Sequence, residues 1–142
     1  MHITTRFLQP AVLLFAIGSG GAALSDQDRR KLSGHEIKQI FSDVEDRAIV
    51  ADSEGTTAVN YWYSDGRFIN RWKNRTDSGE VSGTWRVHND QRCVLIRTGL
   101  PDRIGRETCA PMYQQGDLYI SVNPDGSIHG RHSLSPIHPQ AN

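Results

Sequence analysis

The segment between residues 79 and 113 constrains the fold of this chain most, because it holds three candidate strands and both cysteines. From residue 81 to residue 87, apolar side chains alternate with polar ones, a period of two that is typical of a strand with one polar face. Cys93 and Cys109 lie on the second and third of these candidate strands. The first expectation is therefore an antiparallel sheet cross-linked through its middle.

Residues 1–25 read as a secretory signal peptide, with Arg6 before an apolar run at residues 11–17 and small residues after it. Cleavage after Ala23 or after Ser25 would fit the small-residue pattern of such peptides. The alternative is a membrane anchor, but the run is shorter than the about 20 apolar residues that cross a bilayer. We therefore expect a periplasmic or secreted protein with no membrane span after cleavage.

An oxidising compartment and an even count of two cysteines favour a disulfide between Cys93 and Cys109. The bridge would close a loop of about 17 residues, which the chain-entropy model values at about 3 kcal/mol. The alternative is a pair of free buried thiols. Two thiols cannot complete a cysteine-rich zinc site by themselves.

The charge balance excludes whole classes of partner. The chain has 16 basic and 16 acidic residues, and removal of the signal peptide takes away only Arg6. Such a balance leaves no electrostatic footprint for nucleic acid and no polybasic patch for a membrane surface. We expect no nucleic-acid partner and no cofactor.

One short helix is predicted at about residues 33–42. Ser33 can cap it, and Glu36 three residues later completes a capping box. Ile37 and Phe41 belong to a narrow apolar stripe at helical period. A helix this short is marginal alone, so it has to dock this stripe on the rest of the fold.

Everything after the helix reads as strand and turn. Strands are predicted at residues 47–51, 57–64, 67–73, 81–87, 93–97, 106–113, 118–122 and 127–133. Short connections make consecutive strands antiparallel neighbours. We therefore expect a mainly β fold, an antiparallel meander of about eight strands, in the form of an up-and-down barrel or a strongly curved, lipocalin-like sheet.

The domain organisation follows from these elements. Residues 26–134 form a single β-domain, with a loosely ordered charged leader at residues 26–31 and the helix at its N-terminal side. Residues 135–142 contain two prolines and are expected to be an irregular tail.

Three histidines, His129, His132 and His138, lie near the C-terminus, and His129 and His132 are the candidates for a metal site. His129 and His132 are three residues apart, which places them on opposite faces of a strand. We therefore interpret them as surface or turn histidines. A metal-binding protein or metal-dependent enzyme that uses them stays an alternative.

No other motif points to catalysis. The chain lacks a G-x-S-x-G nucleophile motif. Ser82 and His88 share a strand face but lie about 20 Å apart along it, so they cannot form a triad with Asp90. We therefore expect a binding protein and not an enzyme, although catalysis stays open, and we assign no catalytic residue.

Acidic residues cluster where the helix leads into the first strand. They are Asp43, Glu45, Asp46, Asp52 and Glu54. The spacing of a calcium-binding EF-hand loop is absent. We interpret the cluster as a solvated acidic loop.

Aromatic residues are the most informative candidates for a binding surface. Tyr61 and Tyr63 share one face of their strand and Trp62 takes the other, where the helix is expected to cover it. An exposed aromatic beside an arginine suits a binding surface. The predicted ligand-binding residues are Tyr61, Tyr63, Trp72, Trp85 and Arg86.

Two resemblances rest on short motifs. Gly83, Thr84 and Trp85 are similar to the G-x-W signature of lipocalins and the G-T-W of avidin-type barrels, although the triplet lies in mid-chain here. The chain also resembles a family of small secreted proteins of alphaproteobacteria. The motifs that carry this second resemblance are L-S-G-x-E-I at residues 32–37, D-G-R at 65–67, G-T-W-R-V at 83–87 and the cysteine pair. It implies a periplasmic β fold and supplies no catalytic residue.

The functional expectation is a small secreted β-domain that binds a small apolar or amphipathic molecule in the barrel mouth, or an envelope protein. Burial and shape would supply the affinity, and a few arginines would fix the orientation. A structural or interaction module with a filled core is the other alternative, beside the metal-dependent one.

Overall fold

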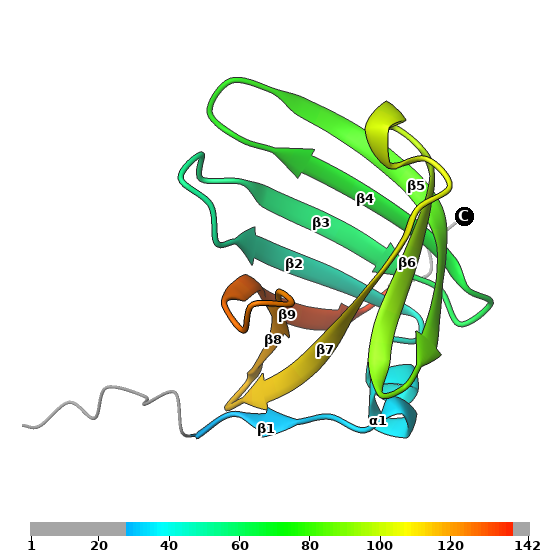
Figure 1. Ribbon diagram of the computed structural model, residues 1–142, viewed down its shortest axis with the longest axis vertical. Helices are drawn as coiled ribbons and strands as arrows, with labels where there is room; N and C mark the ends of the chain where they lie inside the picture. Colours follow the sequence, from blue (N-terminus) through cyan, green and yellow to red (C-terminus); the bar gives the residue numbers. More distant parts are fainter. Residues whose placement is uncertain (1–27, 138–142) are drawn as a thin grey trace, which may run out of the picture.

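The computed structural model describes residues 28–137, and it is a closed antiparallel β-barrel with one α-helix (Figure 1). The predicted signal peptide and His138 lie outside these residues. Within the described chain, no helix is both long and apolar enough to span a membrane.

Eight strands of the described chain form the barrel wall. They are β2 (Val44–Val50), β3 (Thr57–Trp62), β4 (Arg67–Lys73), β5 (Ser78–His88), β6 (Gln91–Thr98), β7 (Glu107–Gln115), β8 (Leu118–Val122) and β9 (Ile128–Pro136). Each strand pairs with the next one along the chain, and β9 also pairs with β2 over seven residue pairs, which closes the barrel. The prediction of a mainly β, antiparallel meander of about eight strands is confirmed, in its closed form.

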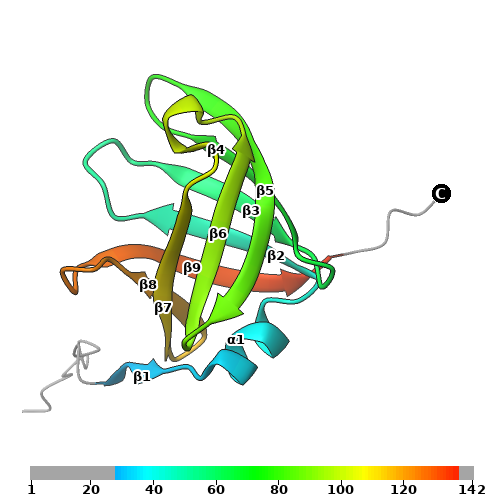
Figure 2. The same cartoon turned by 45° about the vertical axis from the view of Figure 1, so that its right-hand side comes forward.

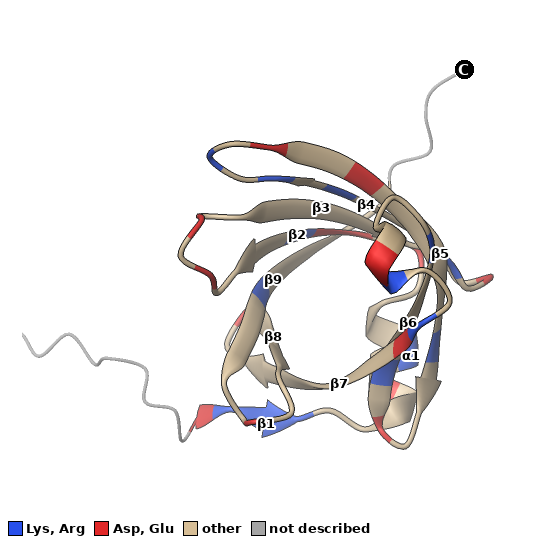
Figure 3. Cartoon of the chain, turned by 45° about the horizontal axis from the view of Figure 1, so that its top comes forward, with Lys and Arg blue, Asp and Glu red and all other residues tan. Residues whose placement is uncertain are grey.

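Tight turns set the register of the meander, as the sequence predicts. Asn89 and Asp90 join β5 to β6 with φ angles of 50° and 54°, the backbone of a two-residue hairpin turn whose twist matches its strands. Charged residues gather in the loops of the end farther from the helix, and η2 (Pro101–Arg103) lies over this end (Figure 3).

Helix α1 (Gly34–Ile40) lies across the other end of the barrel (Figure 2). The predicted capping box is present, since the Ser33 hydroxyl accepts from the Glu36 amide and the Glu36 carboxylate accepts from the Ser33 amide. The Ser33 amide and the Arg30 guanidinium lower the pKa of Glu36 to about 2. The Gly34 amide donates to Asp90 at 2.6 Å, which ties the helix start to the β5–β6 turn.

The helix closes its end of the barrel with apolar side chains. The buried core cluster comprises Leu32, Ile37, Phe41, Trp62, Phe68, Val81, Trp85 and Met112. Trp62 stacks on Phe68 with ring centroids 4.4 Å apart and meets Phe41 edge-on at 6.3 Å. The prediction that the helix covers Trp62 is therefore confirmed, because Phe41, which caps the C-terminus of α1, contacts the Trp62 ring.

The disulfide is present as predicted, with an S–S length of 2.03 Å between Cys93 and Cys109. The two residues are direct partners in the β6–β7 ladder. The bridge therefore joins neighbouring strands in mid-sheet.

Several boundaries differ from the sequence expectations, such as the start of β5 at Ser78, and three of the differences come from pairing between strands distant in sequence. The expected loose leader contains β1 (Arg30–Lys31), which pairs with β7 beside the end of β6. Strand β2 begins at Val44, and β9 continues to Pro136, because these two strands pair with each other there. The regular structure thus extends past residue 134, and Pro136 ends a strand at a position where the missing amide does little harm.

Gly83 is predicted to be indispensable to this wall. The sheet register shifts between Ser82 and Gly83, and a Cβ at residue 83 would meet the Leu95 carbonyl oxygen at 2.0 Å. We expect Gly83→Ala to lower the free energy of unfolding by about 3 kcal/mol or more, since backbone of a neighbouring strand must move. Urea unfolding followed by circular dichroism measures this.

Gly130→Ala is the matched control, because a Cβ there meets its nearest atoms at 3.4 Å, an ordinary contact. Equal stabilities of the two variants would contradict the inferred close approach of β5 and β6.

Candidate functional site

A row of polar side chains crosses the middle of the barrel. The register places Asp46 of β2 opposite Asn60 of β3, and Asn60 opposite Asn70 of β4. Asp46 is 0% exposed and Asn60 is 5% exposed. The expectation that Asp46 belongs to a solvated acidic loop is therefore wrong, because β2 begins early enough to turn this carboxylate inward.

The Asp46 carboxylate accepts hydrogen bonds from three buried side chains. Its Oδ2 accepts from Asn60 Nδ2 at 3.1 Å, from Trp62 Nε1 at 2.9 Å and from His132 Nδ1 at 2.9 Å. Burial alone would raise the pKa of Asp46, but the bond from His132, the nearby Arg92 charge and the bond from Trp62 outweigh it and lower that pKa. Asp46 is thus a buried anion whose hydrogen bonds hold it ionised.

His132 connects Asp46 to a serine. Its Nε2 lies 2.9 Å from the Ser121 Oγ of β8. In the neutral tautomer with the proton on Nδ1, Nε2 accepts from the Ser121 hydroxyl; in the protonated imidazole the bond is reversed, and the Ser121 hydroxyl donates to the Gly130 carbonyl at 3.5 Å. Ser121, His132 and Asp46 therefore follow one another in the order of a hydrolytic triad. Ser121 is 1% exposed and His132 is 4% exposed.

The other end of the network points away from the helix. Asn60 Oδ1 accepts from Asn70 Nδ2 at 2.6 Å, and Asn70 is half-buried. Asn70 thus forms the accessible end of a polar network that begins at Ser121.

Arg92 is a second buried charge at this level. It is 8% exposed, and its guanidinium carbon lies 4.1 Å from the Trp62 ring centroid and 4.7 Å from that of Phe41. Burial lowers the pKa of Arg92 to about 10, against the attraction of Asp46, so the side chain stays protonated at neutral pH. Among residues 28–137, no acceptor bonds its Nη1.

We call the part of the barrel beyond this polar row the distal half. Its inward-facing side chains include small residues, namely Ala48, Ala58 and Gly130. Trp72 faces inward here and is half-buried, and so are Val94 and Ile96, which pair with Trp85 and Gly83 of β5; all three pack against the core cluster. The Trp72 indole packs against Gly79, and its Nε1 has no acceptor within the described chain. The distal half is therefore less completely filled than the end beneath the helix.

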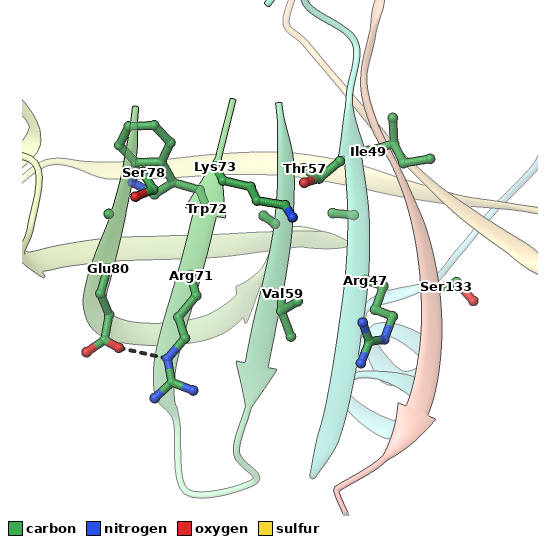
Figure 4. A pocket seen from close by; sticks show the side chains of 13 residues that line it. Arg47, Ile49, Thr57, Val59, Arg71, Trp72, Lys73, Ser78, Glu80 and Ser133 are labelled. Atoms are coloured by element: carbon green, nitrogen blue, oxygen red, sulfur yellow. Dashed lines mark hydrogen bonds and ion pairs between the residues drawn. The ribbon is translucent and has the colours of Figure 1, made fainter. Parts of the chain in front are cut away.

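The outer wall carries a groove of about 870 Å³ over β2–β5, and its lining also includes Ala48, Ala58 and Trp72 (Figure 4). Arg47, Val59 and Arg71 lie on this face, and Arg71 donates to Glu80 at 2.8 Å. The groove thus offers a surface of mixed polar and apolar side chains, on which Lys73 adds a further positive charge.

The five predicted ligand-binding residues do not converge. Tyr61 and Tyr63 lie on the outer face beneath Arg71 and Arg67, with cation–ring distances of 5.7 Å and 4.4 Å. Trp72 lines the distal half.

Trp85 is in the core, where its Nε1 donates to the Tyr63 carbonyl at 2.8 Å. Arg86 pairs with Glu107 outside. Only Trp72 of the five thus faces the distal half.

The histidine candidates are likewise apart. His129 is exposed, but the interpretation of His132 as a surface or turn histidine is wrong, because it is buried and bonded to Asp46 and Ser121. In the described part of the chain, the only grouping with metal-ligand spacing is Cys93, Glu107 and Cys109, whose sulfurs form the disulfide.

Sequence patterns singled out neither Ser121 nor Arg92. A signal for Arg92 was available in the sequence. It is a charged residue at a position of β6 where the period of two predicts an inward-facing side chain, between Val94 and the β5–β6 turn.

Comparisons of the chain with protein-family models, with curated proteins and with solved structures found no match.

Asp46 is predicted to control acid stability. Because its pKa is lower in the folded state, its contribution is present above the ordinary carboxyl pKa and is lost as pH falls through the folded-state pKa. Asp46→Asn should lower the free energy of unfolding by about 3–5 kcal/mol near pH 7, because the new amide NH2 group would face the N–H donors that now bond the carboxylate. Its stability should then depend less on pH between pH 7 and pH 3, as urea unfolding at several pH values would show.

Asp117→Asn, at an exposed turn position, serves as the control and should behave as wild type. An Asp46→Asn protein with the wild-type pH dependence would contradict the role given to this carboxylate.

Proposed function

We propose that the protein binds a small amphipathic molecule in the distal half of the barrel. The observation that carries the proposal is the half-buried state of inward-facing Trp72, Val94 and Ile96. Side chains that point into a filled core lose nearly all their exposure, as Trp62 does at 2%. Inward-facing apolar groups that keep exposure provide a surface for an apolar ligand.

The surroundings suit a ligand with two kinds of surface. Ala48 and Ala58 leave room beside the aromatic ring of Trp72, and Asn70 presents an amide at the polar row. The unpartnered Trp72 Nε1 would be satisfied by an acceptor oxygen, which removes a desolvation cost of about 1–3 kcal/mol. The ligand would thus bury an apolar part and offer oxygen atoms.

We also propose that the protein works in an oxidising compartment, the periplasm or the cell exterior. The Cys93–Cys109 disulfide supports this placement. The resemblance to small secreted proteins supports it as well.

A second candidate function is acyl transfer at Ser121, favoured by the hydrogen bonds that link Ser121, His132 and Asp46. The absence of a side chain at Gly130 would leave the approach to the two reacting atoms open, since a Cβ there lies 3.4 Å from His132 Nε2 and 3.5 Å from Ser121 Oγ. The low exposure of Ser121 ranks this function below ligand binding.

Trp72→Ala is predicted to weaken binding of a neutral fluorescent probe, N-phenyl-1-naphthylamine, about tenfold, because it removes an aromatic wall of the site. Dodecanol should displace the probe from wild type. Tyr61→Ala, a truncation on the outer face, is the control and should bind as wild type. Binding unaffected by Trp72→Ala but lost in Tyr61→Ala would move the site to the outer wall and sink the proposal.

The acyl-transfer candidate predicts a covalent adduct on Ser121 after incubation with a fluorophosphonate, detected by mass spectrometry of the intact protein. It also predicts hydrolysis of p-nitrophenyl acetate that Ser121→Ala abolishes. A wild-type protein that stays unlabelled and inert eliminates this candidate and leaves the binding proposal in place.

A further inference from the structure

We propose that Arg92 binds an oxyanion, the carboxylate or phosphate end of the molecule held in the barrel. This inference rests on the proposed function and adds the charge of the ligand. It makes Arg92 the residue that selects an acidic amphiphile over a neutral one.

The first argument is that Arg92 is a buried cation without an ion pair. Within residues 28–137, it forms no salt bridge, and its Nη1 has no acceptor. Asp46 attracts it electrostatically, but the Asp46 oxygens are taken by Asn60, Trp62 and His132. A buried charge without a partner is costly by several kcal/mol, so it calls for a functional explanation.

Other arginines of the chain show the contrast. Five exposed arginines pair with carboxylates at 2.7 or 2.8 Å. The pairs are Arg30–Glu36, Arg47–Glu45, Arg67–Asp65, Arg71–Glu80 and Arg86–Glu107. Surface arginines thus have counter-ions, although an exposed ion pair contributes little to stability. The guanidinium inside the barrel has none within the described chain.

The second argument is the orientation of the guanidinium. Rings of Trp62 and Phe41 lie 4.1 Å and 4.7 Å from its carbon, which contributes a cation–π attraction of up to about 2 kcal/mol when desolvated. The two ring planes are nearly perpendicular, at 87°, so the planar group can stack on only one of them, and its N–H edge at Nη1 has no acceptor within the described chain. A carboxylate or phosphate matches such an edge with two parallel hydrogen bonds.

The third argument is the path from the distal half. Arg92, Val94 and Ile96 alternate inward along β6, so an apolar strip runs from the guanidinium along this strand, beside Trp85 and Gly83 of β5. Four strand residues span about 13 Å, the length of a medium-chain alkyl group. An alkyl chain along Val94 and Ile96 would place its acid group at Arg92.

The test compares dodecanoate, below its critical micelle concentration, with dodecanol, below its solubility limit, by displacement of N-phenyl-1-naphthylamine. We expect wild type to bind dodecanoate at least tenfold more tightly than dodecanol. In Arg92→Met, a replacement of similar length, dodecanol binding should persist and the preference should vanish. Dodecyl phosphate in place of dodecanoate distinguishes the two oxyanions.

Arg97→Met is the matched control, because Arg97 lies on the same strand and is exposed. It should keep the preference. Thermal unfolding provides a second readout, since dodecanoate should raise the Tm of wild type and of Arg97→Met but not of Arg92→Met. Arg92→Lys keeps the positive charge but loses the paired N–H groups of the guanidinium, so its preference for dodecanoate over dodecanol should be reduced.

A wild type that binds both ligands equally, or an Arg92→Met that still prefers dodecanoate, overturns the inference and leaves the proposed function intact. A wild type that binds neither ligand nor the probe overturns both.

Discussion

Closure of the barrel by the pairing of β2 with β9 is the constraint on which the rest of the structure depends. It joins the first and last strands of the wall and removes the two open edges of a meander. It also brings together Asp46 and His132, which are 86 residues apart in sequence. Without this contact there would be neither an inner face nor a polar row across it.

The two buried charges inside the barrel, Asp46 and Arg92, have different surroundings. Asp46 receives hydrogen bonds from three side chains and is stable without a ligand. Arg92 receives two aromatic faces and no counter-ion within the described chain. A protein that only needed a stable core would gain from an apolar residue at such a position. The asymmetry is therefore more readily understood as a site that a ligand completes.

The fold was largely predictable from the sequence, since its signals are local. The capping box of Ser33 and Glu36 placed the helix, and alternation around Trp85 placed β5 on the correct face. The site was not predictable in the same way. Asp46 resembled its solvated acidic neighbours, and its inward orientation depends on β2 starting at Val44, which only the β9 pairing reveals. Ser121 and His132 lie on different strands, so no spacing in the sequence links them.

An NMR titration of the tryptophan indole and arginine Nε signals with dodecanoate would test most directly whether the barrel interior is a binding site. The account predicts that Trp72, Trp62 and Arg92 shift together, while Trp85, bonded to the Tyr63 carbonyl in the core, changes little. Shifts confined to the outer groove, at Arg47 and Arg71, would contradict it, as would a spectrum that does not change.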